Sequence, residues 1–462
     1  MPNAANRQPR TAAFALALAA FAGLFGARPA RAVPSFAAQT GQPCAMCHIG
    51  AFGPQLTPFG RAFKIGGYTQ DGGQGPAAHI PLAAFILSSF TRTQGSQPTP
   101  PADHFNTNDN PALDQISLFL AGRASDNVGA FIQGTYSGID QSIVLDNSDL
   151  RLTREFPVAD TSLRVGLSLN SGPTVQDPYN STPAWIFPFA SSVLAPTPAA
   201  APLLDGGLLG NSVGLTAYAW YDRSVYAEAG AYGTRSPSLL QITGDSLGPG
   251  ATAQPAPYVR LAYEWNWNGQ SAHIGALALA ASLEPAIASR FADGSFGHDR
   301  YVDLAVDGGY QFLGSGRHVA TADLLLLHEN RSLDGSVGMG LASRADGNLT
   351  EARATFTYYF DATYGVTFGV HSLTGSADPV LYAPAPVTGS RSGRPDTTDF
   401  VIEADWIPFG KADSWAAPFA NLKLGAQYTA YTKFNGGTGN YDGFGRSASA
   451  NDTLYLYAWL AF

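Results

Sequence analysis

The chain has few cysteines and few charges. Only Cys44 and Cys47 are cysteines among its 462 residues, so a zinc site built from further cysteines has no ligands to draw on. Charged residues make up 13%, and 51 residues are glycine, which indicates many turns and much surface that does not face free water. The net charge of -9 argues against nucleic acid as a partner, because nucleic-acid binding requires a basic surface.

Long apolar runs are also missing after the N-terminal segment, so no transmembrane helix is expected. The N-terminal segment itself has the pattern of a secretory signal peptide. A basic start with Arg7 and Arg10 precedes the apolar run Thr11–Gly26, and Ala30-Arg31-Ala32 supplies a cleavage site. We therefore predict that residues 1–32 are removed and that the protein is exported. A closed β-barrel can still cross a membrane, because all its backbone groups are paired.

Both cysteines belong to the stretch Gln42–His48, which reads Q-P-C-A-M-C-H. C-x-x-C-H is the attachment motif of c-type haem: the two thiols bind the macrocycle covalently and the histidine coordinates the iron. A redox dithiol and half of a metal site are the alternatives for C-x-x-C alone. A dithiol would be expected in a βαβ setting, which does not follow here. We therefore predict one haem c held by Cys44 and Cys47, with His48 as the proximal iron ligand.

Residues 33–79 are predicted to form the haem segment. Thr57 and Pro58 have the pattern of a helix start. Arg61 and Lys64 are candidates for contacts to the haem propionates, and a solvated helix face is the alternative. The apolar residues with helical spacing, expected to pack against the macrocycle, are Phe52, Leu56, Phe59 and Phe63.

The second iron ligand is harder to place from sequence. Met46 lies between the anchoring cysteines, and Met339 falls in a predicted outer loop, so methionine ligation is not favoured. His79 closes the linker before the first strand and is the candidate distal ligand. An open or water-bound position is the main alternative, and His104 would require a haem placed high in the barrel.

From residue 80 to the end, apolar and polar residues alternate with period two. In Tyr258–Asn268, for example, Val259 and Leu261 face one way while Arg260 faces the other. Repeated segments of about ten alternating residues indicate an outer-membrane β-barrel, with a soluble β-sandwich as the alternative. We predict an all-β fold of about sixteen antiparallel strands, at 80–93, 112–124, 128–138, 142–156, 161–171, 211–222, 224–235, 256–268, 271–285, 300–313, 317–330, 350–361, 364–374, 397–408, 418–432 and 452–462.

The predicted connections alternate between short turns and long loops, except for a short connection near Ile139 where a long one would fall. This asymmetry is typical of barrels with periplasmic turns and extracellular loops, and an even strand count puts both termini in the periplasm. The last strand ends on the aromatic Phe462. The longest loop, Gly172–Gly210, contains several prolines and aromatic rings, and we predict that it folds into the lumen over the haem.

Several charged side chains should face the lumen, where they either pair across it or hold a cation near the haem. The predicted acids are Glu264, Asp303, Asp307, Glu351, Glu403 and Asp405, and the predicted bases are Arg151, Arg164, Arg260 and Arg353. The histidines of the strands, predicted to be lumen or rim residues without metal-ligand spacing, are His273, His298, His318, His328 and His371.

Three stretches resemble the outer-membrane fused monohaem cytochrome–porin family, the iron-oxidising type of outer-membrane cytochrome c. They are P-S-F-A-A-Q-T-G-Q-P-C-A-M-C-H at Pro34–His48, L-T-P-F-G-R-A-F-K at Leu56–Lys64, and P-T-V-Q-D-P-Y-N-S-T-P-A-W at Pro173–Trp185. The resemblance implies a porin-like barrel of residues 80–462 in outer-membrane lipid. It also implies electron transfer from an extracellular donor such as Fe(II) to a periplasmic carrier, a cytochrome or a copper protein.

Fe(II):cytochrome c oxidoreductase activity would need no acid–base residue, and the chain shows no Ser/His/Asp or paired-carboxylate constellation. Two other functions fit the same sequence. One is an outer-membrane solute channel, a porin, with an accessory haem segment for sensing or assembly. The other is a soluble periplasmic cytochrome fused to a β-domain.

Overall fold

The structure of the chain is a computed structural model, and the part of the chain that it describes begins at Ser35. The predicted signal peptide and the candidate ligand His79 lie outside the described residues. The described ranges are 35–72, 81–182, 185–245, 248–287, 290–291, 295–314, 316–417 and 419–462.

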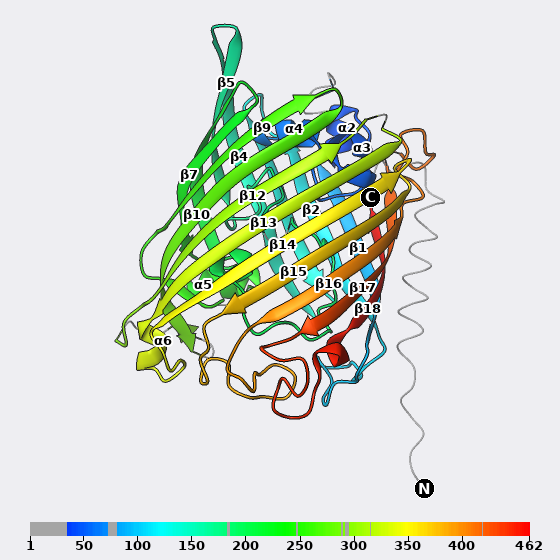
Figure 1. Cartoon of the computed structure of the whole chain (residues 1–462). Coiled ribbons are helices and arrows are strands. Elements are labelled where there is room, and N and C mark those ends of the chain that lie inside the picture. Colours follow the sequence, from blue (N-terminus) through cyan, green and yellow to red (C-terminus); the bar gives the residue numbers. More distant parts are fainter. Residues whose placement is uncertain are drawn as a thin grey trace.

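A single closed antiparallel β-barrel forms most of the molecule (Figure 1). Each strand pairs with its neighbours along the chain, and β1 pairs with β18 to close the sheet, with Phe85 opposite Ala461. Two of the eighteen described strands, Gly250–Thr252 (β8) and Arg290–Phe291 (β11), are short additions, which leaves sixteen in the wall. The predicted fold class is therefore confirmed, and the β-sandwich alternative is wrong.

The sixteen wall strands agree with the predicted ranges to within four residues at each end. Their bounds are Leu82–Thr93 (β1), Asn110–Arg123 (β2), Val128–Ser137 (β3), Ser142–Val158 (β4), Thr161–Asn170 (β5), Ser212–Tyr221 (β6), Val225–Thr234 (β7), Ala256–Trp267 (β9), Gln270–Ile287 (β10), Asp299–Phe312 (β12), His318–Leu333 (β13), Asp346–Phe360 (β14), Tyr364–Gly375 (β15), Thr397–Trp406 (β16), Asn421–Lys433 (β17) and Thr453–Ala461 (β18).

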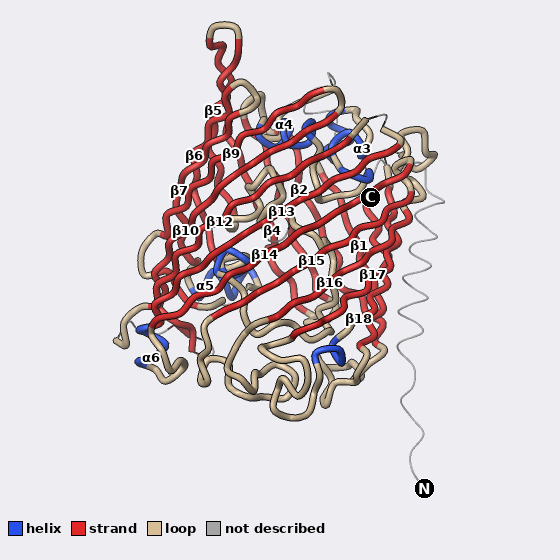
Figure 2. Tube along the Cα trace, viewed as in Figure 1, coloured by secondary structure: helices blue, strands red, loops and turns tan. Residues whose placement is uncertain are grey.

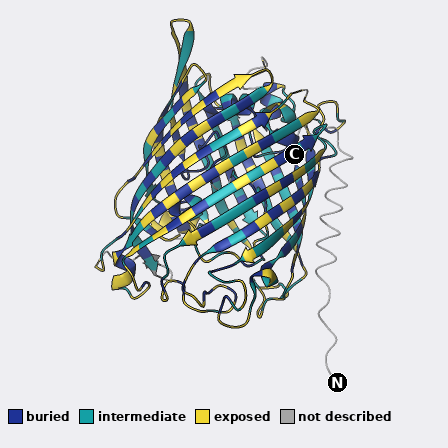
Figure 3. Cartoon of the chain, in the orientation of Figure 1, coloured by how far each residue is buried: buried dark blue, intermediate teal, exposed yellow. Residues whose placement is uncertain are grey.

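Exposed and buried residues alternate along the strands, as the chequered pattern of Figure 3 shows. In β9, Leu261 is 61% exposed on the outer face, whereas Arg260 is buried on the lumen side. Successive side chains of a strand point to opposite faces, so an apolar outer face forces the polar residues inward. The barrel thus has an apolar exterior and a polar lumen, which is the arrangement of an outer-membrane barrel.

The two rims of the barrel differ. One rim carries mostly tight turns, such as 159–160 between β4 and β5, together with the start of β1 and the end of β18. The other carries the long connections, apart from the short turn around Ile139. The predicted alternation is confirmed. We call these the short-turn rim and the long-loop rim. The β4–β5 hairpin projects beyond the other short turns (Figure 1).

Short helices lie at the short-turn rim and in the connections, as Figure 2 shows by colour. Within the described residues, no helix combines the length and the apolar character that crossing a bilayer requires. The helical elements are Ser35–Thr40 (α2), Cys44–Cys47 (α3), Ile49–Ala51 (η1), Pro58–Ile65 (α4), Leu203–Gly207 (η3), Pro237–Thr243 (α5), Asp334–Gly338 (α6) and Ala448–Asn451 (η4).

A charge on the outer face should destabilise the barrel. Replacing Leu261 with arginine puts a cation in the apolar band, and we expect the free energy of unfolding to fall by about 2–4 kcal/mol. Unfolding titrations in phospholipid vesicles measure this loss. Ile242→Arg is the matched control, because Ile242 is also exposed but lies in α5, outside the wall strands. Equal losses for both variants would contradict the assignment of the outer face.

Candidate functional site

The C-x-x-C-H motif forms one helical turn inside the short-turn end of the barrel. Cys44 and Cys47 are the first and last residues of α3, so their side chains lie on the same side of that turn. Both thiols are free and half-buried. His48 follows with an extended backbone, at φ -120° and ψ 138°, which turns the chain out of the helix directly after the second cysteine.

Helix α4 is locked onto the motif by its first turn. Thr57 caps the helix through a hydrogen bond from the Gly60 amide, and Pro58 follows it, as predicted. The Thr57 hydroxyl donates to the Met46 carbonyl at 2.5 Å, and its amide donates to the Cys47 carbonyl at 2.9 Å. A Cβ atom on Gly60 would lie 2.2 Å from that carbonyl oxygen. Only glycine lets α4 approach the motif this closely.

One edge of the His48 ring faces the loop that joins the motif to α4. A Cβ on Gly53 would lie 3.6 Å from Nδ1, and Nδ1 is buried without a hydrogen bond of good geometry. Burial lowers the pKa of His48 to about 4, against the opposing effect of backbone groups of Gln55 and Pro54. The imidazole is therefore neutral near pH 7, as a metal ligand must be.

The thiol environment is unlike that of a redox dithiol. Burial, and secondly the neighbouring Cys44, raise the pKa of Cys47 to about 12. Reactive dithiols have lowered pKa values, so the dithiol alternative has little support. In the described parts of the chain, no three His, Cys, Asp or Glu side chains are grouped to hold a metal ion. Two thiols on one turn and an adjacent neutral imidazole are the donor set that a c-type haem requires.

Two of the four apolar residues predicted to contact the macrocycle pack against other aromatic rings of the protein. Phe52 packs against Trp459 of β18, with ring centroids 5.3 Å apart, and Phe63 packs against Phe36 at 4.9 Å. Both are buried. Leu56 and Phe59 are half-buried beside the motif, and contact between these two and a haem stays a prediction.

Arg61 and Lys64 are buried, so the predicted alternative of a solvated helix face is wrong. Lys64 donates to the Asp177 carbonyl at 2.8 Å. Arg61 lies within 3.0 Å of Glu264 in β9 and donates further hydrogen bonds to the wall and to its own segment. These bonds run to Ser271 at 2.7 Å, to Gln311 at 3.2 Å and to the Leu56 carbonyl at 3.0 Å. Arg61 and Lys64 thus both have protein partners. The contact of these two residues with haem propionates stays a prediction.

Residues 35–72, which we call the plug, are fastened to the wall on several sides. Sequence reasoning missed these anchors, because each joins residues far apart in the chain. They are Gln55 to Asp323 of β13 at 2.8 Å, Tyr68 to Asp149 of β4 at 2.7 Å, Asn421 of β17 to the Ala51 carbonyl at 2.7 Å, and Tyr218 of β6 to the Ile65 carbonyl at 2.7 Å.

The connection Gly172–Gly210, which we call the lumen loop, folds into the barrel as predicted. Asn180 accepts a hydrogen bond from the Leu56 amide of the plug at 2.9 Å. Asp177 lies 3.3 Å from Arg260 of the wall and also accepts hydrogen bonds from its own loop. At the far end of the loop, the Leu204 amide donates to Asp303 at 2.7 Å. The lumen loop therefore bridges the plug and the wall.

Many of the charged side chains predicted to face the lumen form ion pairs, which is one of the two predicted alternatives. Several of their partners are not the predicted arginines. Arg260 pairs with Asp307 at 2.6 Å, and Arg353 pairs with Glu351. Most of the other predicted charges have ionic partners outside the predicted set: Glu264 pairs with Arg61, Glu403 and Asp405 with Lys423, Arg151 with Asp149, and Arg164 with Glu155. Asp303 accepts a hydrogen bond from the Leu204 amide.

Most predicted histidines have polar neighbours in or beside the strands. His371 faces Asp399 and Glu351. The other contacts are His273 to Asp307 at 3.8 Å, His318 to Tyr358 at 2.7 Å and His328 to Thr350 at 2.8 Å. Nδ1 of His298 is buried without a hydrogen-bond partner, and His104 is exposed in its loop.

A closed sixteen-strand barrel with an apolar exterior and a loop folded into its lumen defines a porin-like outer-membrane protein. No protein-family model matches the chain, and no curated protein sequence matches it. Solved structures that are similar to it include an outer membrane channel and an anion-selective porin.

Three of these structures illustrate the similarity. OmpF of Salmonella typhi, in complex with daunomycin, has 11% identity, covers 83% of this chain and 98% of its own, and gives a TM-score of 0.47. The outer membrane channel DcaP of Acinetobacter baumannii has 14% identity, covers 84% of this chain and 99% of its own, and gives a TM-score of 0.45. OprB of Pseudomonas putida has 11% identity, covers 82% of this chain and 93% of its own, and gives a TM-score of 0.48.

Substituting Gly60 tests the contact between α4 and the motif. In Gly60→Ala the new Cβ would overlap the Cys47 carbonyl, so α4 must shift, at a cost of about 1–3 kcal/mol. We expect a lower thermal transition and faster proteolysis of the plug. The control is Gly439→Ala, since nothing lies within 4 Å of its Cβ position. Unchanged proteolysis of Gly60→Ala would show that the contact does not hold the plug.

Proposed function

We propose that the chain carries single electrons across the outer membrane, from an extracellular donor such as Fe(II) to a periplasmic carrier, through one c-type haem attached inside the barrel. The observation that carries the proposal is the position of the C-x-x-C-H motif within the lumen, in a plug fastened to the wall. A haem segment that hung outside the barrel would leave the whole insulating band to be crossed.

In this proposal Cys44 and Cys47 would hold the porphyrin covalently, and His48 would bind the iron. When bound, the haem supplies an iron that changes between its ferrous and ferric states by one electron. The plug buries Nδ1 of the imidazole, which keeps the ring neutral and oriented. His79 stays the proposed distal ligand, with an open position as the alternative.

The proposed orientation follows from the rims. The short-turn rim, which carries the plug and the C-terminus, faces the periplasm and the carrier, a cytochrome or a copper protein. The long-loop rim faces the extracellular donor. The apolar band that separates them is about 25 Å tall in barrels of this kind, so an electron carrier placed within the lumen shortens the distance to be crossed.

A solute channel with an accessory haem segment is the second candidate, and the porin-like barrel itself favours it. Its lumen contains a cavity of about 330 Å³ toward the long-loop rim. This function requires a continuous path past the plug and the lumen loop. It therefore predicts conductance after reconstitution, whereas an electron conduit does not need an open path.

Proteoliposomes with a defined orientation test the proposal. We expect the full-length protein to retain haem after denaturation, and that haem to be reduced when Fe(II) is supplied only at the long-loop rim. Optical spectra follow the reduction, and planar bilayers measure conductance. Cys44→Ala combined with Cys47→Ala should lose the covalent haem while the barrel still folds.

Each outcome separates the candidates. Haem reduction from the long-loop side with low conductance supports the conduit. Large conductance with haem that Fe(II) cannot reduce from that side supports the solute channel. A wild-type protein that carries no covalent haem would exclude the conduit altogether.

A further inference from the structure

One turn of the lumen loop is folded tightly by its own side chains. Residues 177–182 belong to the third of the three stretches that carry the family resemblance. The carboxylate of Asp177 is buried and accepts hydrogen bonds from the amides of Tyr179 at 3.0 Å and Ser181 at 2.8 Å. The Ser181 hydroxyl donates to the same carboxylate at 3.0 Å. Asp177 thus fixes a turn that has Asn180 within it.

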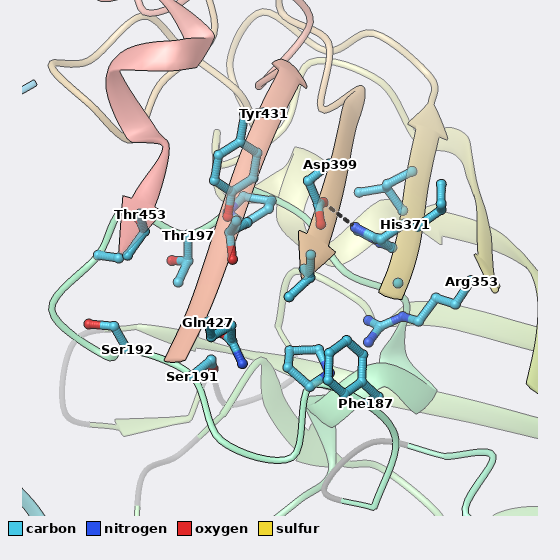
Figure 4. Close-up of a pocket in the computed structure, with 18 of the residues that line it drawn as sticks. Phe187, Ser191, Ser192, Thr197, Arg353, His371, Asp399, Gln427, Tyr431 and Thr453 are labelled. Atoms are coloured by element: carbon cyan, nitrogen blue, oxygen red, sulfur yellow. Dashed lines mark hydrogen bonds and ion pairs between the residues drawn. The ribbon is translucent and has the colours of Figure 1, made fainter. Parts of the chain in front are cut away.

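This turn and the rest of the lumen loop have different neighbours. Farther along the chain, the loop lines the cavity of about 330 Å³, with Phe187 and Thr197 among the lining residues (Figure 4). The turn at Asn180 contacts the plug instead. Asn180 has a φ of 58°, a left-handed conformation that asparagine adopts more readily than most other residues.

The side chain of Asn180 holds the plug on both sides of Gln55. Its Oδ1 accepts a hydrogen bond from the Leu56 amide at 2.9 Å, and its Nδ2 donates to the Pro54 carbonyl at 3.3 Å. A side-chain amide carries both an acceptor and a donor, so one asparagine can hold two peptide groups of the same segment. The positions of these two peptide groups are therefore fixed from the lumen loop.

The segment that Asn180 holds also faces His48. The amide directly after His48 donates to the Gln55 carbonyl at 3.0 Å, and His48 itself forms a β-bridge with Leu56. A Cβ on Gly53 would lie 3.5 Å from Cε1 of the imidazole. A histidine that binds a metal is usually oriented by a group that faces its second ring nitrogen. For His48, this face of the ring is next to the segment that Asn180 holds.

We propose that Asn180 is a positioning residue for His48. By fixing the peptide groups of Pro54 and Leu56, it keeps the imidazole in the orientation in which it binds the haem iron. The effect on the iron rests on the proposed function, whereas the contact between Asn180 and the plug does not. The third stretch of the resemblance, although it lies in the barrel part of the sequence, then serves the proximal side of the haem.

Hydrogen exchange tests the contact, and acid displacement of the histidine tests its effect on the iron. Asn180→Gly removes the amide group, and glycine adopts a φ of 58° without strain. We expect the amides of residues 49–56 to exchange about tenfold faster, because two hydrogen bonds to the segment are lost. This should hold in the full-length haem protein and in the double variant Cys44→Ala, Cys47→Ala.

In the haem protein, optical spectra follow the loss of the histidine ligand as the pH falls. We expect the midpoint for Asn180→Gly to lie about one pH unit higher than for the wild type, since loss of an orienting group weakens metal ligation by about tenfold. Tyr68→Phe is the matched control, because it removes a 2.7 Å hydrogen bond between the plug and the wall that does not involve this segment. Its midpoint should equal that of the wild type.

A second variant keeps the test valid if Asn180→Gly does not fold. Asn180→Asp keeps the acceptor for the Leu56 amide and tolerates the same φ, so its midpoint should lie between those of Asn180→Gly and the wild type.

Four outcomes would count against the proposal. Unchanged exchange in Asn180→Gly would show that the contact does not hold the segment. Faster exchange with an unchanged acid midpoint would overturn the positioning role, because Asn180 would then only fasten the loop. Equal midpoint shifts in Asn180→Gly and Tyr68→Phe would overturn it as well. If the full-length protein carries no covalent haem, the proposed function fails and the role at the iron fails with it, whereas faster exchange in Asn180→Gly still shows the contact.

Discussion

Closure of the sheet between β1 and β18 is the constraint on which the rest of the structure depends. With Phe85 paired to Ala461, the wall has no free edge, and every strand presents one face to lipid and one to the lumen. Apolar side chains outside require charges inside. These charges cannot be left unpaired in a confined space, because a buried charge without a partner costs several kcal/mol.

The plug and the lumen loop meet this requirement. Arg61 enters the lumen on α4 and pairs with Glu264 of the wall, and both side chains are 2% exposed. Asp177 of the lumen loop does the same for Arg260. The ion pair that neutralises Glu264 therefore also fastens the segment that carries the C-x-x-C-H motif to the wall. Removing the plug would leave Glu264 without its main partner.

Most of the wall could be predicted from sequence, because alternation of apolar and polar residues is a local pattern. The largest departures lie where strands continue beyond the apolar band. Strand β14 begins at Asp346, four residues before its predicted start, and β2 includes Pro111. Residues such as Asp346 show no apolar alternation, and proline suggests a loop, so sequence gave no sign of these extensions.

In the candidate site, too, the local features could be predicted from sequence and the long-range contacts could not. Thr57 and Pro58 marked the start of α4 because capping is local, whereas the partner of Arg61 lies 203 residues away. The sequence alone did not show which of the lumen-facing acids pairs with Arg61. Only the register of β9 places Glu264 opposite the plug. Sequence reasoning therefore found the motif and the wall, but it assigned Glu264 to other arginines and missed Asp177.

The interior is filled unevenly, and this matters for both candidate functions. At the short-turn rim the plug contacts the wall through hydrogen bonds from Gln55, Tyr68 and Arg61. Toward the long-loop rim, the lumen loop leaves a cavity lined by Glu351 and Asp399. A solute that enters from the long-loop side meets the lumen loop and the plug in turn. Between the cavity and the plug, Tyr455 and Tyr457 belong to one buried cluster with Ile49 and Phe52. A solute channel would therefore need a path past both the lumen loop and the plug, whereas an electron conduit would not.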